Sequence, residues 1–170
     1  MNRLRRDLAA PAFPGDDGSA PPDVTAALAA YDADPAAGHA AALATLQDSR
    51  LLVPVVATLG EVEHDADGLA HDKSSDMAAV LVTGRDGRTA LLAFTSTTSL
   101  EGWNPDARPV SVPTRQAARA ALQDGADALV VDLAGPVLFA VEGQDLSDLA
   151  DGLVLRELTD GWGWTRRLGG

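Results

Sequence analysis

The sequence predicts a single α+β domain in which helices pack on a mixed β-sheet, and three observations support this fold class. A chain of 170 residues suits one domain with a substantial core better than two. Strand-like and helix-like segments alternate in its second half, whereas the first half contains a hairpin pattern. Hydrophobic residues make up 46% of the chain and aromatic residues 4%, so we expect a folded protein with a largely aliphatic core.

The hairpin pattern lies between Asp76 and Trp103, and we expect it at the centre of the sheet. Two apolar runs, Met77–Val82 and Ala90–Phe94, flank a turn-like segment at residues 84–88 that contains two glycines and an aspartate. Because these residues favour tight turns, the segment predicts an antiparallel β-hairpin. Neither run alternates between apolar and polar residues, which is typical of strands that are covered on both faces.

The segments before the sheet differ in composition. Residues 1–22 contain prolines and glycines with few large apolar side chains, which predicts a flexible N-terminal arm. Residues 23–49 predict two helices, the first capped by Asp23 and the second begun by Asp34-Pro35. The pattern of these helices fits both a position over the sheet and an extended arm that binds a partner.

Residues 50–158 form the predicted α+β domain, and residues 159–170 a C-terminal tail. The first strand, 50–57, contains Pro54, which lacks an N–H and therefore predicts an edge position or a bulge. The hydroxyl-bearing residues 95–99 predict a cap for a short helix over Leu100 and Trp103. The remaining expected elements are a strand at 109–112, a helix at 115–123 capped by Thr114 with Leu122 facing inward, strands at 128–133 and 137–141, a helix at 145–151 and a strand at 153–158.

Composition excludes several classes of function. The formal charge of −12 disfavours a protein that binds nucleic-acid phosphates. The absence of cysteine excludes disulfides and thiolate chemistry. No apolar run approaches the roughly 20 residues that span a bilayer, and the basic N-terminus leads into no secretory signal. We therefore expect a cytoplasmic protein that does not enter a membrane, and the twelve arginines beside one lysine, with abundant alanine, indicate a bacterial, GC-rich genome.

The acidic loop at residues 61–76 is the strongest candidate for a metal site. An EF-hand alignment that begins at Glu63 fails, because the twelfth position requires a bidentate glutamate and is Ser74. The two histidines are not spaced as helical neighbours, which also disfavours zinc. We interpret the segment as a solvated loop and expect no cofactor. The weak candidate ligands are His64, Asp65, Asp67 and His71.

No catalytic residue is predicted. Ser96 lacks a G-x-S-x-G elbow and an obvious histidine partner, so capping is the favoured interpretation. His39 falls on an N-terminal helix, where we expect it to face solvent. No phosphate loop of the G-x-x-x-x-G-K-[ST] type is present. These observations favour a protein without catalysis.

The C-terminal tail carries the candidate partner-binding residues Trp162, Trp164, Arg166 and Arg167. Tryptophan and arginine are enriched at interaction hot spots, so the tail is a candidate contact for a protein partner. The alternative is that the two indoles fold back onto the domain, as the end of the last strand. Stacking on RNA bases is a third interpretation, which the net charge disfavours.

Several segments together resemble the SseB N-terminal-domain family of bacterial proteins. They span about residues 50–152 in the order of the family: LVPV at 52–55, DMA at 76–78, LLAFTS at 91–96 followed by Trp103, and DALVVDLAGP at 127–136. The resemblance implies a bacterial protein of a family without established enzymatic activity, and it carries no catalytic residue to this chain.

The function favoured by these observations is a non-enzymatic interaction or regulatory module of the cytoplasm that binds a protein partner. The alternative is a small-ligand-binding or enzymatic domain. Its site would be built from the acidic loop at 61–76 and the region of Ser96 and Trp103.

Overall fold

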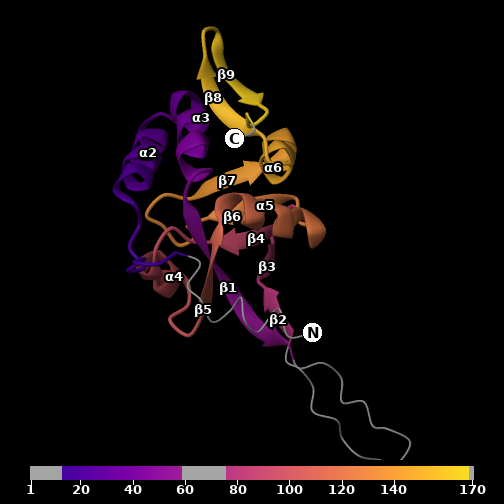
Figure 1. Cartoon of the computed structure of the whole chain (residues 1–170). Coiled ribbons are helices and arrows are strands. Elements are labelled where there is room, and N and C mark those ends of the chain that lie inside the picture. Colours follow the sequence, from indigo (N-terminus) through magenta and orange to yellow (C-terminus); the bar gives the residue numbers. More distant parts are fainter. Residues whose placement is uncertain (1–12, 59–75, 169–170) are drawn as a thin grey trace, which may run out of the picture.

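Strand β1 (Arg50–Thr58) joins the two larger sheets of the protein. The computed structural model describes residues 13–58 and 76–168 (Figure 1). In a three-stranded antiparallel sheet, β1 lies between β2 (Asp76–Ala79) and β5 (Arg108–Pro113). Leu52 and Phe94 exchange two backbone hydrogen bonds of 2.8 Å, which connect β1 to the second sheet.

The second sheet is mixed and has the strand order β3-β4-β6-β7. The parallel pair is β4 with β6, and the other two pairs are antiparallel. Together with the helices that cover it, this sheet confirms the predicted α+β class with a mixed sheet. The strands are β3 (Leu81–Thr83), β4 (Thr89–Ala93), β6 (Ala128–Val131) and β7 (Phe139–Glu142).

The predicted hairpin forms between β3 and β4, but its first apolar run is divided. The turn is closed by the Gly84 N–H, which donates to the Arg88 carbonyl at 2.7 Å. Residues 81–83 pair with β4, whereas residues 76–79 pair with β1 in the other sheet. As a result β3 is an edge strand and β4 lies inside the sheet. Leu91 and Leu92 point to opposite faces of β4 and both are fully buried, so this strand is covered on both sides as predicted. The same prediction is wrong for β3, where Leu81 is 41% exposed because the strand lies at the edge of the sheet.

The prediction that Pro54 marks an edge strand is wrong, because β1 has partners on both sides. On one side Pro54 lies opposite Pro109 of β5. The nitrogen of Pro54 faces the other side of β1, the same side as the Leu52 N–H. On that side Leu52 bonds Phe94, and the pairing with β2 begins only at Val55. The missing N–H therefore falls in the gap between two partners, where no ladder bond is lost.

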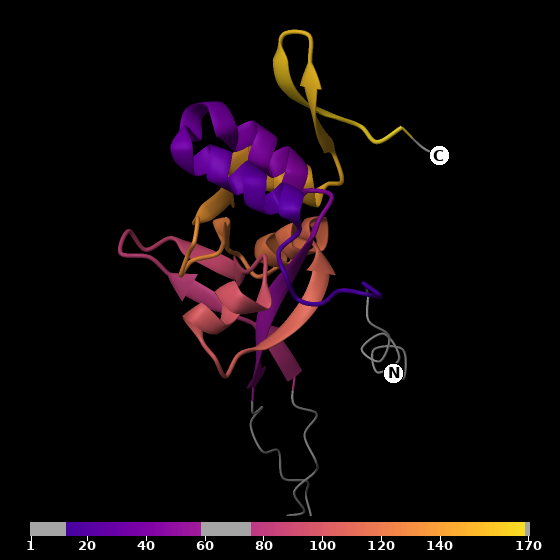
Figure 2. The ribbon, with the colours of Figure 1, turned by 90° about the vertical axis from the view of Figure 1, so that its left-hand side faces the viewer.

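Helices α2 (Pro22–Ala33) and α3 (Pro35–Leu46) lie side by side over the sheet (Figure 2). Leu28 and Leu43 belong to the main hydrophobic core, so these helices cover the sheet rather than extend from it. The Asp34 carboxylate accepts a hydrogen bond from the Ala37 N–H and caps α3 as predicted. The cap predicted at Asp23 is wrong, because α2 begins one residue earlier at Pro22, whose fixed φ suits the first helical position.

Three further helices complete the domain. Helix α4 (Thr97–Trp103) covers the face of the sheet that carries Leu92 and Phe94, while α5 (Thr114–Gln123) and α6 (Gly143–Ala150) pack into the main core. Thr114 does not cap α5 as expected. It is the first helical residue, and its hydroxyl donates to the Ser49 carbonyl at 3.0 Å. Leu122, expected to face inward, is 41% exposed. Within the described residues no helix has the length and apolarity to cross a membrane.

Residues 13–21, expected to belong to a flexible arm, form a strap that is held against the domain. The Asp16 carboxylate forms an ion pair with Arg50 at the start of β1. The Gly18 carbonyl accepts from the N–H of Thr97 at 2.7 Å, and the Ser19 carbonyl accepts from the Arg50 guanidinium at 2.7 Å. The strap is therefore part of the folded structure, while residues 1–12 lie outside the described part.

A two-stranded ribbon ends the described chain. Strands β8 (Val154–Leu158) and β9 (Gly161–Thr165) pair with each other and with no other described strand. The ribbon projects from the domain beside α3 in both views (Figures 1 and 2). Residues 161–165, which the sequence places in a tail, are thus a strand.

Candidate functional site

The residues proposed as metal ligands lie outside the described part of the chain. His64, Asp65, Asp67 and His71 all fall within residues 59–75. Among residues 13–58 and 76–168, no three histidine or carboxylate side chains come together as a metal site would require.

Ser96 caps helix α4, as the sequence predicts. Its Oγ accepts from the Ser99 N–H at 3.0 Å, and the Ser99 Oγ accepts from the Ser96 N–H at 3.2 Å, which completes a reciprocal capping box. Trp103, the other half of the proposed Ser96 region, packs its ring on Phe94 with the centroids 5.6 Å apart. In the described structure both residues serve the local fold.

His39 does not simply face solvent, contrary to the prediction. Its ring stacks on Phe139 with a centroid distance of 5.0 Å, and its Nε2 lies 3.4 Å from an Asp145 carboxylate oxygen. The other oxygen of Asp145 accepts from the Trp164 indole N–H at 3.0 Å. Asp145 therefore links α3, α6 and β9, and it anchors the base of the ribbon.

A buried polar network at Asp132 was not found from the sequence. This carboxylate is 1% exposed and accepts three hydrogen bonds: from the Thr95 N–H at 2.9 Å, the Thr95 hydroxyl at 2.7 Å and the Ser99 hydroxyl at 2.8 Å. Burial raises the pKa of Asp132, and the three donors oppose that rise only partly. Since the carboxylate is enclosed and its bonds are internal, the network serves the fold. The only sequence feature that could have pointed to this network is the pair of segments that contain its residues, LLAFTS at 91–96 and DALVVDLAGP at 127–136.

The same network continues through Arg50 to the strap. The guanidinium is buried and donates to the carbonyls of Thr95 and Ser19. It also donates to both carboxylate oxygens of Asp16, at 2.7 and 3.0 Å. The hydrogen bond from Arg50 holds the pKa of Asp16 below its ordinary value of 3.8. Because these carbonyl and carboxylate oxygens occupy the donors of a buried guanidinium, this part of the network also stabilises the fold.

The edge of β8 that faces α3 is occupied by the side chain of Gln47. The Gln47 amide nitrogen donates to the Leu155 carbonyl at 2.8 Å, and its oxygen accepts from the Leu155 N–H at 2.9 Å. Gln47 thus makes both bonds that a neighbouring strand would make at this position. Further along this edge lies the charged residue Glu157, a residue type that discourages strand pairing.

The edge of β9 is free within the described structure. Leu155 lies opposite Trp164, and directly opposed residues of an antiparallel pair either bond each other or both face away. Because the Leu155 backbone bonds Gln47, the backbone groups of Trp164 face the outer edge of β9. The same alternation turns the N–H and C=O of Trp162 outward. Within the described structure the ribbon therefore has one edge that Gln47 covers at Leu155 and one edge that no side chain covers in this way.

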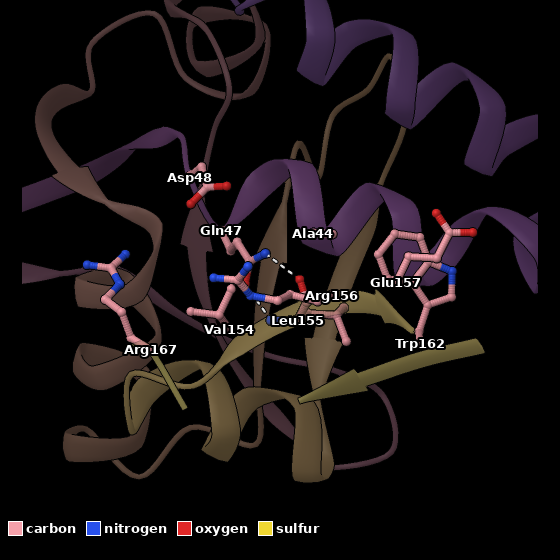
Figure 3. A pocket seen from close by; sticks show the side chains of 9 residues that line it. All are labelled: Ala44, Gln47, Asp48, Val154, Leu155, Arg156, Glu157, Trp162 and Arg167. Atoms are coloured by element: carbon pink, nitrogen blue, oxygen red, sulfur yellow. Dashed lines mark hydrogen bonds between the residues drawn. The ribbon is translucent and has the colours of Figure 1, made fainter. Parts of the chain in front are cut away.

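An open pocket of about 480 Å³ lies between α3 and the ribbon (Figure 3). The bonds between Gln47 and Leu155 cross its centre, with Trp162 at one end and Arg167 at the other. Its wall combines an indole, two arginines and two carboxylates. The full lining consists of Ala44, Gln47, Asp48, Val154, Leu155, Arg156, Glu157, Trp162 and Arg167.

The four candidate partner-binding residues lie on or just after β9 and differ in exposure. Trp164 packs against the main core and bonds Asp145, so this indole folds back onto the domain. Trp162 is 41% exposed at the pocket, and Arg166 and Arg167 are exposed beyond the end of the strand. The structure thus separates one anchoring tryptophan from three accessible residues.

An α+β domain built on a mixed sheet, with a projecting two-stranded ribbon, defines the class of this protein. Comparison with known families matches residues 24–148 of the 170 to the family described as the SseB protein N-terminal domain. This match spans more than half of the chain, and the protein belongs to that family. No curated protein and no solved structure matches the chain. The ribbon lies beyond the matched residues.

Proposed function

We propose that this chain is a non-enzymatic cytoplasmic module that binds another protein, and that an extended segment of the partner adds as a strand to the free edge of β9. The observation that carries the proposal is the asymmetry of the ribbon. Gln47 occupies the edge of β8, while the backbone groups of Trp162 and Trp164 on β9 have no described strand beside them. An open strand edge is a ready template for an added strand.

Side chains near this edge suit such a role. Trp162 is exposed next to the edge and offers a large rigid contact. Leu158, 49% exposed, lies over Gly163, where an added Cβ would approach its Cδ1 to 2.6 Å. Glycine at 163 therefore lets the leucine cover the outer face of the ribbon. Trp164 and Asp145 hold the base of the ribbon to the domain, which lowers the entropic cost of binding.

The test separates backbone pairing from side-chain contact at one position. Trp162→Ala removes the indole and keeps the outward N–H, whereas Trp162→Pro removes both and leaves the pairing with β8 intact, because that N–H does not face β8. Wild-type chain and both variants are immobilised and used to capture proteins from a bacterial lysate, with circular dichroism to verify folding. Leu138→Ala, which truncates a residue 47% exposed elsewhere on the surface, is the matched control.

We expect one or more proteins to be enriched by the wild type and by Leu138→Ala, reduced by Trp162→Ala and lost with Trp162→Pro. A partner that Trp162→Pro retains at the wild-type level would contradict strand addition. Failure of the wild type to enrich any protein would contradict the interaction role itself.

A further inference from the structure

Three arginines meet where α5, the end of α6 and the segment after β9 come together. Arg115 and Arg119 lie one turn apart on α5, so their side chains share a face. Both reach Gly152: a Cβ at this residue would lie 3.9 Å from the Arg115 Cδ and 4.0 Å from an Arg119 terminal nitrogen. Arg167 lines the pocket beside α3 together with Asp48, and both charges act on Arg115. We call these three residues the arginine cluster.

The charges of the arginine cluster are poorly balanced by the protein. In the part of the chain that the structure describes, none of the three has a carboxylate oxygen within 4.0 Å, whereas Arg50 and Arg88 each do. Burial, and then the charges of Arg167 and Arg119, lower the pKa of Arg115, and only Asp48 opposes them. Such a concentration of positive charge is unusual in a chain of net charge −12.

The hydrogen-bonding groups of the cluster are only partly used. The Arg119 Nε donates to the Ala150 carbonyl at 2.8 Å, which fixes the side chain and leaves its terminal nitrogens available. The Arg115 Nε is enclosed and has no acceptor, and one terminal nitrogen reaches the Leu153 carbonyl only at 3.5 Å. A buried donor without an acceptor is costly, so the site is incompletely satisfied by the protein alone.

We propose that the arginine cluster binds a phosphate-bearing ligand. Guanidinium groups bind phosphate oxygens through paired N–H donors, and helix α5 together with the Ala150 contact holds two of them in place. In the described structure none of the three guanidinium groups has a carboxylate oxygen within 4.0 Å, and a phosphate dianion balances such a cluster better than a single carboxylate does. This site is separate from the β9 edge and does not depend on the proposed strand addition.

The full chain is titrated with inorganic phosphate by calorimetry, and with acetate at matched ionic strength as the carboxylate comparator. Arg115→Gln, Arg119→Gln and Arg167→Gln test the cluster, and Arg108→Gln is the control because Arg108 is exposed on β5. We expect saturable phosphate binding that Arg108→Gln leaves unchanged and that each cluster variant weakens about tenfold or more. Arg119→Lys, which keeps the charge without the planar fork, should lie between.

The proposal is overturned if the wild type does not bind phosphate, if acetate binds as tightly, or if Arg108→Gln weakens binding as much as the cluster variants do. A second titration with phosphoserine identifies the source of the phosphate. Tighter binding of phosphoserine supports a phosphorylated side chain as the ligand, and equal binding supports free phosphate or a small phosphorylated molecule.

Discussion

Replacing Gln47 tests how the ribbon is held to the domain. Gln47→Ala removes both hydrogen bonds to Leu155, a residue that is 6% exposed, and leaves a buried N–H and a buried C=O without partners. Each unsatisfied group costs about 1–3 kcal/mol. The combined cost of the two groups is limited, because the ribbon can loosen and let water reach them. We therefore expect the free energy of unfolding to fall by about 2–4 kcal/mol. Gln47→Glu keeps the acceptor and loses the donor, and about half of that loss is expected.

Urea denaturation followed by circular dichroism measures the change, and hydrogen exchange of the Leu155 amide reports on the ribbon itself. Exchange at Leu155 should accelerate in Gln47→Ala, while amides of β4 and β6 should follow only the global stability. Gln144→Ala is the control, because Gln144 is exposed and bonds only Asp148 on its own helix. A loss below about 0.5 kcal/mol for Gln47→Ala, with Leu155 protected as in the wild type, would refute the reasoning.

Three further carboxylates give predictions of different kinds. Burial raises the pKa of Asp132 in the folded protein above its ordinary value of 3.8. Below about pH 3.8 the carboxyl is protonated in both the folded and the unfolded chain, and the free energy of unfolding has its full value. As the pH rises through the folded-state pKa, the free energy of unfolding falls, because only the folded chain has to bury the charge. The unfolding free energy of Asp132→Asn relative to wild type should therefore increase with pH above 3.8 in urea titrations. Asp145→Ala removes the acceptor of the Trp164 indole and should cost about 1 kcal/mol in urea denaturation. Asp16→Ala leaves the buried Arg50 guanidinium without its carboxylate and should cost about 1–3 kcal/mol in the same assay.

Matched variants and opposite outcomes define each of these tests. Asp148→Ala on the same helix as Asp145, and Asp17→Ala beside Asp16, should leave stability close to that of the wild type. A pH-independent difference between Asp132→Asn and wild type would contradict the burial of a charge at that position. Losses no larger than those of the controls would contradict the anchoring roles of Asp145 and Asp16.

Local rules predicted the elements of the fold better than their partners. Asp34-Pro35, the turn at Gly84 and the serine cap at Ser96 were all recognisable, because capping and turn chemistry depend on a few neighbouring residues. The division of the run at 76–83 between two sheets was not recognisable, since both halves have the same apolar pattern. Pro54 misled for a related reason: the rule assumes one partner on each side, and β1 changes partners at that residue.

Long-range polar contacts were the other part that the sequence did not reveal. The arginine cluster draws on residues of α5 and of the segment after β9. The Asp132 network combines the segment after β4, helix α4 and the turn after β6. Nothing in the spacing of such residues shows that the chain brings them together. In the tail, Trp162 and Trp164 stood out by residue type. Trp164 folds back onto the domain, which was one of the three interpretations considered, while Trp162 is exposed and its role in partner binding stays a prediction.

The strap and the ribbon limit how far the chain can be shortened at its two ends. The residues that match the family begin at 24 and end at 148, so a chain shortened to them would lack both Asp16 and Leu155. Arg50 would then lose its counter-ion and Gln47 its backbone partner, although neither of these two residues is removed. The contacts that hold the folded structure together therefore extend beyond the family match at both ends.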